Sequence, residues 1–174
     1  MSDKTYHTLF LCTGNSARSI MAEVLLNTLG HDRFKAYSAG SHPGAQINPL
    51  TIDVLQSTQL PVDGLRSKSW DEFARPGAPQ MDFVITLCDS AAGEECPLWP
   101  GQPITAHWSF ADPSAFKGTD QEKHQFFDKI FRQIANRIRI FTSLPLATLD
   151  RVAIKRELDA LGDQVAKTNA TTSE

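Results

Sequence analysis

Residues 8–19, TLFLCTGNSARS, join a short apolar run to a polar loop that leads into a helical pattern. The apolar run at 9–11 is typical of a buried strand, and apolar residues then recur at helical spacing until Gly30. Cys12 is therefore predicted at the carboxyl end of a strand, where a loop begins that leads into a helix. The apolar residues of the helical pattern are Met21, Ala22, Leu25, Leu26 and Leu29.

The loop after Cys12 has the features of an oxyanion site. A helix N-terminus carries unpaired backbone N–H groups and the positive end of the helix dipole, so a tetrahedral oxyanion can bind there. Gly14 and Asn15 suit the unusual backbone angles of an anion nest, and the Arg18 guanidinium can clamp two substrate oxygens. The same positive field favours the thiolate of Cys12, to which the Ser19 hydroxyl can donate a hydrogen bond. The predicted oxyanion-binding residues are Thr13, Gly14, Asn15, Ser16, Ala17, Arg18 and Ser19.

An inert, buried cysteine is the alternative interpretation of Cys12, because free cysteines are often small buried hydrophobes. A Cys and an Arg six positions apart also occur by chance. Here the strand, the Gly-Asn pair, the Arg-Ser pair and the helix follow in the order that an oxyanion site needs. The combination favours a nucleophilic role.

Apolar runs alternate with helical patterns along the rest of the chain. This alternation predicts a small doubly wound α/β sandwich of three layers with a four-stranded parallel sheet. In such folds ligands bind at the carboxyl edge of the sheet, where the Cys12 loop is expected. Further strands are expected at 35–39, 83–87 and 104–108, and helices after the caps Asn48 and Ser69, from Asp120, and from Pro145 through Val165, before a polar tail predicted to be disordered.

The composition is typical of a globular domain, with 174 residues of which 41% are hydrophobic and 21% charged. A net charge of −3 and a pI near 5.9 argue against a nucleic-acid partner. The N-terminal apolar run is too short for a signal peptide or a membrane span, so we expect a cytoplasmic location without membrane association. Three cysteines, in a chain without secretory features, favour reactive or metal-binding thiols over a disulfide framework.

Two further chemical groups are expected at the same edge of the sheet. Cys88 follows the apolar run at 83–87, and Cys96 comes eight residues later, after an acidic loop that contains Gly. Parallel strands end at one edge, so Cys88 is expected near Cys12, and Cys96 could swing toward Cys88. Asp112 could present a carboxyl group there and protonate a departing oxygen. A buried strand-end cysteine and a turn aspartate are the alternatives.

A zinc site is the competing function for these thiols. Zinc takes four ligands, whereas this region offers two thiols at a spacing unlike that of a zinc knuckle. His107 lies in an apolar stretch, where we expect it to form a local hydrogen bond instead. No metal ligand is therefore predicted.

Four motifs occur together: LCTGNSARS at 11–19, YSAG at 37–40, TLCDSAAGEECP at 86–97 and HWSFADP at 107–113. In combination they resemble arsenate reductases of the low-molecular-weight protein tyrosine phosphatase superfamily, over residues 8–141. The resemblance implies a phosphatase-like arsenate reductase domain at 1–144, followed by a C-terminal helical extension with a disordered tail at 145–174. We expect this extension to pack on its own domain and the protein to be a monomer.

The resemblance implies a mechanism with three thiols. Cys12 attacks arsenate, and Asp112 protonates the departing oxygen. Cys88 then attacks Cys12, arsenite leaves, and Cys96 attacks Cys88 to form a Cys88–Cys96 disulfide. Phosphate and sulfate are expected to compete with arsenate for the loop.

The same resemblance bears on the reductant and on potassium. It implies no tightly bound cofactor and an external thiol reductant, thioredoxin. The gap between Cys88 and Cys96 is one residue longer than in the best-known thioredoxin-coupled relatives, and Ala17 replaces a common Cys, so glutathione with glutaredoxin is the alternative. Asn15, Glu23 and Ser38 match positions at which some relatives bind potassium, but Ser69 stands where an Asp is expected, which speaks against a potassium site.

Two other functions fit parts of the sequence. A phosphatase of the same superfamily would use the same loop and Asp112, but such enzymes usually carry a Tyr where this chain has Ser114, and they do not need Cys88 and Cys96. A non-catalytic oxyanion sensor gated by a disulfide is the second alternative. Asp112 and the ordered thiols favour catalysis over binding alone.

Overall fold

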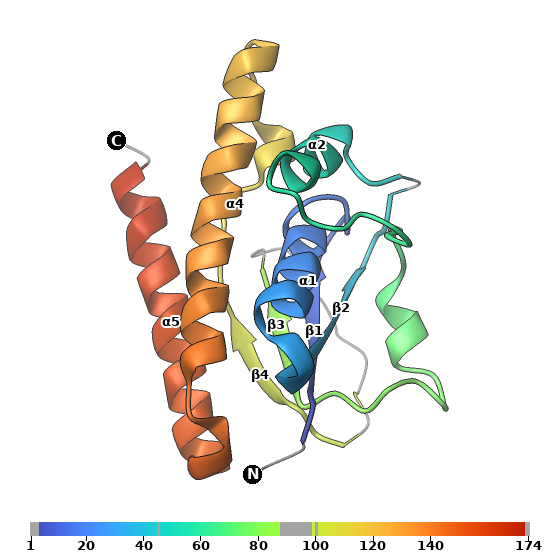
Figure 1. Cartoon of the computed structure of the whole chain (residues 1–174), viewed down its shortest axis with the longest axis vertical. Coiled ribbons are helices and arrows are strands. Elements are labelled where there is room, and N and C mark those ends of the chain that lie inside the picture. The colour runs from blue at the N-terminus through green and yellow to red at the C-terminus, as the bar shows by residue number, and fades with distance from the viewer. Residues whose placement is uncertain (1–3, 45, 88–98, 100, 173–174) are drawn as a thin grey trace.

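The computed structural model describes residues 4–44, 46–87, 99 and 101–172, with side chains as far as residue 163 in the last helix. Four strands form one parallel sheet in the order β2-β1-β3-β4, which confirms the predicted fold class (Figure 1). The register places Cys12 opposite Gly40, and Thr86 opposite both Leu11 and His107, so the carboxyl ends share one edge. The strands are β1 (Tyr6–Cys12), β2 (Phe34–Gly40), β3 (Phe83–Thr86) and β4 (Ile104–His107).

The described helices are α1 (Arg18–Leu29), α2 (Pro49–Ser57), α4 (Asp120–Ser143) and α5 (Arg151–Thr172), with short 3-10 turns η1 (His31–Arg33), η2 (Trp70–Phe73), η3 (Pro113–Ala115) and η4 (Leu146–Thr148). Side-chain caps fix several of their starts. The side chains of Asn48 and Ser69 cap α2 and η2, as predicted. Thr119 caps α4 and forms a reciprocal capping box with Glu122. These local signals explain why α2, η2 and α4 start close to where the sequence predicts.

The sheet separates two apolar clusters. Side chains alternate along β1, so Phe10 faces the larger cluster, whereas Leu9 and Leu11 face the smaller one. The helices α1, α4 and α5 cover the larger cluster, in which Phe141 of α4 packs edge to face on Phe83 at 5.4 Å between ring centroids. Of the described elements, η2 covers the smaller cluster. No helix within the described ranges is long and apolar enough to cross a membrane.

The last helix starts later than the sequence predicts. Residues 146–148 after Pro145 form the turn η4, and α5 begins at Arg151, where Asp150 Oδ1 accepts a hydrogen bond from Ala153 N at 2.8 Å. The prediction was wrong because Asp150 supplies a stronger start signal than Pro145. The helix also continues beyond Val165 to Thr172, since no Gly or Pro interrupts it there.

The helix α5 packs against β4 and the larger cluster. Trp108 Nε1 donates a hydrogen bond to the carbonyl of Leu158 at 3.0 Å, and Leu158 is fully buried. The C-terminal segment therefore packs on its own domain, as expected.

We predict that Gly162→Ala destabilises the fold. At an ordinary helix position this change stabilises by about 1 kcal/mol through helix propensity. Here a Cβ at Gly162 would lie 2.2 Å from the backbone oxygen of His107, so α5 would have to move off β4. Overpacking of this kind costs roughly 1–3 kcal/mol, measurable by urea unfolding. Asp163→Ala, at the exposed neighbouring position, is the control; a stabilised Gly162→Ala variant would contradict the close approach.

Candidate active site

The loop between β1 and α1 is held from outside by residues 41–48. Four backbone N–H groups of this segment donate to loop carbonyls at 2.9–3.3 Å. In a trans peptide the N–H points away from the C=O, so the amides that follow these carbonyls point to the opposite side, into the loop. Inward amides at a helix N-terminus form the anion nest that the sequence predicts. The four acceptor carbonyls belong to Cys12, Thr13, Gly14 and Ser16.

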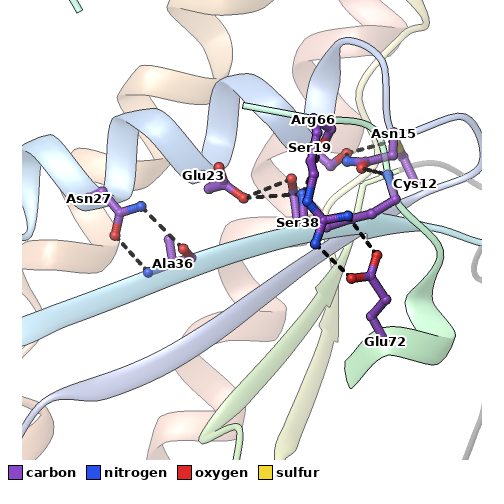
Figure 2. Close-up of polar contacts among 10 residues, drawn as sticks. Cys12, Asn15, Ser19, Glu23, Asn27, Ala36, Ser38, Arg66 and Glu72 are labelled. Atoms are coloured by element: carbon purple, nitrogen blue, oxygen red, sulfur yellow. Dashed lines mark hydrogen bonds and ion pairs between the residues drawn. The ribbon is translucent and has the colours of Figure 1, made fainter. Parts of the chain in front are cut away.

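A chain of hydrogen bonds reaches the sulfur of Cys12 from behind the loop. Asn15, with a positive φ of 47°, donates from Nδ2 to Ser19 Oγ at 2.8 Å, and Ser19 Oγ lies 3.0 Å from Cys12 Sγ (Figure 2). The Ser19 hydroxyl can accept from Asn15 and at the same time donate its own proton to the sulfur. This geometry suits a sulfur that accepts a hydrogen bond, as a thiolate does.

A cleft of about 410 Å³ opens above this loop, and Cys12 lies at its base with 3% of its surface exposed. Arg18 Nη1 donates to the carbonyl of Phe110 at 2.9 Å, and Arg18 Nη2 lies 3.6 Å from Asp112 Oδ2. Asp112 in turn caps η3. The cleft is lined by Cys12, Thr13, Gly14, Ser16, Ala17, Arg18 and Asp112.

The structure divides the predicted oxyanion-binding residues into two groups. Thr13, Gly14, the residues at 16–17 and Arg18 line the cleft, whereas Asn15 and Ser19 are fully buried behind it. The buried pair supports the loop and orients the sulfur. Asp112 lines the same cleft as Cys12, so these two side chains are brought together.

The sequence analysis did not identify the structural role of Gly40, which lies at the end of β2 within the YSAG motif. A Cβ at Gly40 would lie 2.4 Å from the carbonyl oxygen of Thr13 and 3.0 Å from Asn15 N. Only glycine allows this approach without displacing the loop. Lys68 was also missed, although its backbone N–H donates to Asn15 Oδ1 at 2.8 Å. Nothing in the local sequence around Lys68 signals that contact.

The remaining candidates lie partly outside the described residues. Cys88 and Cys96 fall there, so their placement stays a prediction. His107 Nδ1 lies 2.7 Å from Thr86 Oγ1 on the neighbouring strand β3, so its hydrogen bond crosses the sheet and is not the local one expected. Within the described part of the chain, no group of three metal-ligating side chains is present.

Of the residues matched to a potassium site, Ser38 donates from Oγ to Glu23 Oε1 at 3.0 Å. Lys68 Nζ lies 3.8 Å from the same carboxylate oxygen. Ser69 Oγ instead caps η2 by accepting a hydrogen bond from Asp71 N.

Residues 7–157 match the family described as low molecular weight phosphotyrosine protein phosphatase. The chain belongs to this family. The superfamily predicted from the four motifs is thereby confirmed. A relative in this phosphatase family, the arsenate reductase of Bacillus subtilis (strain 168), is 36% identical over 132 residues, which cover 76% of this chain and 91% of that protein.

Two solved structures in the comparison share the phosphatase-family fold. An arsenate reductase from Archaeoglobus fulgidus DSM 4304 has a TM-score of 0.61 at 23% identity, covering 79% of this chain and 99% of that one. A low molecular weight protein tyrosine phosphatase from T. tengcongensis has the same TM-score of 0.61 at 23% identity, covering 80% of this chain and 100% of that one. Proteins with two different activities thus share this fold, and the fold alone does not separate them.

We predict that Gly40→Ala weakens oxyanion binding by about tenfold or more, because the new methyl group displaces the Thr13 carbonyl and with it the inward amides; tenfold corresponds to about 1.4 kcal/mol. Titration with inorganic phosphate, followed by ³¹P NMR, measures the change. Gly44→Ala is the matched control, since a Cβ there meets only an ordinary contact at 3.7 Å. Equal phosphate affinity in both variants would contradict the steric role of Gly40.

Proposed function

We propose that this protein reduces arsenate to arsenite. The observation that carries the proposal is the 36% identity to an arsenate reductase across 91% of that relative's length. The site supports it, because a free cysteine lies at the base of a cleft built for a tetrahedral oxyanion. We further propose that it acts in the cytoplasm as a monomer, in arsenic detoxification.

In the proposed first step, the Cys12 thiolate attacks arsenic while the loop amides and the Arg18 guanidinium hold the other oxygens. A sulfur–arsenic bond forms, and one arsenic–oxygen bond breaks. Asp112 gives its proton to the departing oxygen, which leaves as water. The carboxyl group lies beside Arg18 on the wall of the cleft, 42% exposed, so solvent can return the proton afterwards.

In the proposed second stage, the two electrons come from thiols. The Cys88 thiolate attacks Cys12 Sγ, the sulfur–arsenic bond breaks, and its electron pair reduces As(V) to As(III), which leaves as arsenite. The Cys12–Cys88 disulfide is then attacked by Cys96, which frees the Cys12 thiolate and leaves a Cys88–Cys96 disulfide. An external dithiol reduces that disulfide and completes the cycle. No tightly bound cofactor takes part.

Hydrolysis of phosphate esters is the second candidate, favoured by the same cleft with Cys12, Arg18 and Asp112. A thiol–phosphate adduct would there be resolved by water. Ser114, which accepts a hydrogen bond from Asn48 Nδ2 at 3.2 Å, stands where phosphatases of the family usually carry Tyr. Hydrolysis would leave Cys88 and Cys96 without a role.

We predict that Cys88→Ser abolishes arsenate turnover, because no thiol then resolves the Cys12 adduct, while weak aryl-phosphate hydrolysis survives. A coupled assay of arsenite release and a chromogenic aryl phosphate measure the two activities. Cys12→Ser is the control that lacks both. Undiminished arsenate reduction in Cys88→Ser would overturn the relay, and no turnover of the wild type above Cys12→Ser would favour the sensor instead.

We predict that thioredoxin with thioredoxin reductase supports multiple turnovers of arsenate better than glutathione with glutaredoxin. The proposed final product is an intramolecular disulfide, which a dithiol reduces directly. Mass spectrometry after a single turnover should identify the Cys88–Cys96 bond. A glutathione adduct on Cys12 or Cys88, together with turnover driven by glutaredoxin, would show the other route.

A further inference from the structure

Lys68 and Glu23 form a largely buried ion pair behind the oxyanion loop. Their side chains are only 10% and 14% exposed, and Lys68 Nζ lies 3.8 Å from Glu23 Oε1. The ammonium also donates to the carbonyl of Arg66 at 2.9 Å, and Ser38 Oγ donates to the same Glu23 oxygen. Burial raises the pKa of Glu23 and lowers that of Lys68, and the attraction between them opposes both shifts. Each charge therefore compensates the other where water does so poorly.

Glu23 belongs to a polar row on α1 that faces β2. Ser19, Glu23 and Asn27 are spaced four residues apart, so they share one side of the helix. Figure 2 shows Glu23 directed at Ser38 and Asn27 at Ala36, both on β2. A carboxylate in this row fixes a negative charge one helical turn from the serine that contacts Cys12.

The main chain of Lys68 reaches the oxyanion loop itself. Its N–H donates to Asn15 Oδ1 at 2.8 Å, and its carbonyl accepts from Gly40 N at 2.9 Å. Asn15 in turn is hydrogen-bonded to Ser19 Oγ, which contacts Cys12 Sγ. One residue thus contacts α1 through its side chain and the support of the nucleophile through its backbone.

We propose that Lys68 is a positioning residue for Cys12: its ammonium serves as a built-in cation for Glu23 and thereby holds the backbone N–H that orients Asn15. The inference rests on the proposed function only in taking Cys12 as the reacting group. Because the charge is attached to the chain, the wild-type protein needs no dissolved monovalent cation. Removing the ammonium leaves the carboxylate of Glu23 and the carbonyl of Arg66 beside its place, with Ser38 Oγ bonded to that carboxylate. Oxygen donors suit a hard cation, and K⁺ is similar in size to an ammonium group.

The test compares Lys68→Met with the wild type in tetramethylammonium chloride and in potassium chloride at equal ionic strength. Affinity for inorganic phosphate and the rate of Cys12 alkylation by iodoacetamide, followed by peptide mass spectrometry, are measured. We expect the variant to lose about tenfold in both when K⁺ is absent and to regain much of the loss with K⁺, while the wild type is the same in both salts. Lys155→Met, which removes an exposed lysine paired with Asp159, is the matched control and should behave as the wild type.

A second variant, Glu23→Gln with Lys68→Met, leaves no uncompensated charge and should not respond to K⁺, because the carboxylate is gone. If circular dichroism shows that Lys68→Met does not fold, the proposal is tested by the double variant together with the wild type, neither of which should respond to K⁺. A K⁺ response of the wild type or of the double variant would overturn the proposal, and so would a Lys68→Met variant equal to the wild type in both salts. None of these measurements involves arsenate, so a wild type that fails to reduce arsenate would overturn the proposed function alone.

Discussion

The orientation of the peptide groups between β1 and α1 is the constraint on which this site depends. The carbonyls of the loop are bonded outward to residues 41–48, so the N–H groups are directed inward before any anion arrives. An anion that binds such a loop does not have to reorganise it, and fixed dipoles act most strongly where little reorganisation is needed. In the sheet beneath the loop, Phe10 and Leu11 of β1 are fully buried, and this packing fixes the position of Cys12 at the end of the strand.

Buried polar groups are concentrated around this loop because their hydrogen bonds hold its backbone conformation. Asn15, Ser19, Ser38 and Thr51 are fully buried, and each forms a hydrogen bond in or next to the loop scaffold. Burying such groups costs free energy unless they are paired, so a cluster of them marks a place where shape matters more than apolar packing. The loop is therefore held by a polar scaffold that extends from α1 across β2 to residues 66–69.

Local patterns predicted the strands, the caps at Asn48 and Ser69, and the Cys12 loop, because each of these depends on neighbours in the sequence. The contacts that complete the site are not local. Lys68 lies 53 residues from Asn15, and the two meet only because β2 pairs beside β1 and the chain returns along that edge. Gly40 lies within the YSAG motif, but the reason for a glycine there, the close approach to the Thr13 carbonyl, depends on the same strand order.

We expect the cleft to bind phosphate and arsenate alike, because inward amides and a guanidinium recognise a tetrahedral oxyanion by charge and shape. In the proposed mechanism, what differs between the two oxyanions is the fate of the adduct on Cys12. Arsenic(V) accepts two electrons when a second thiol attacks the sulfur of the adduct. The phosphorus of a thiol–phosphate is not reduced in this way, so that adduct is resolved by hydrolysis. A chain with this loop becomes a reductase only if a second thiol reaches Cys12 faster than water reaches the bound atom. In the proposed mechanism the choice between the two activities therefore depends on Cys88, whereas the loop and Asp112 would prepare the same first step for both.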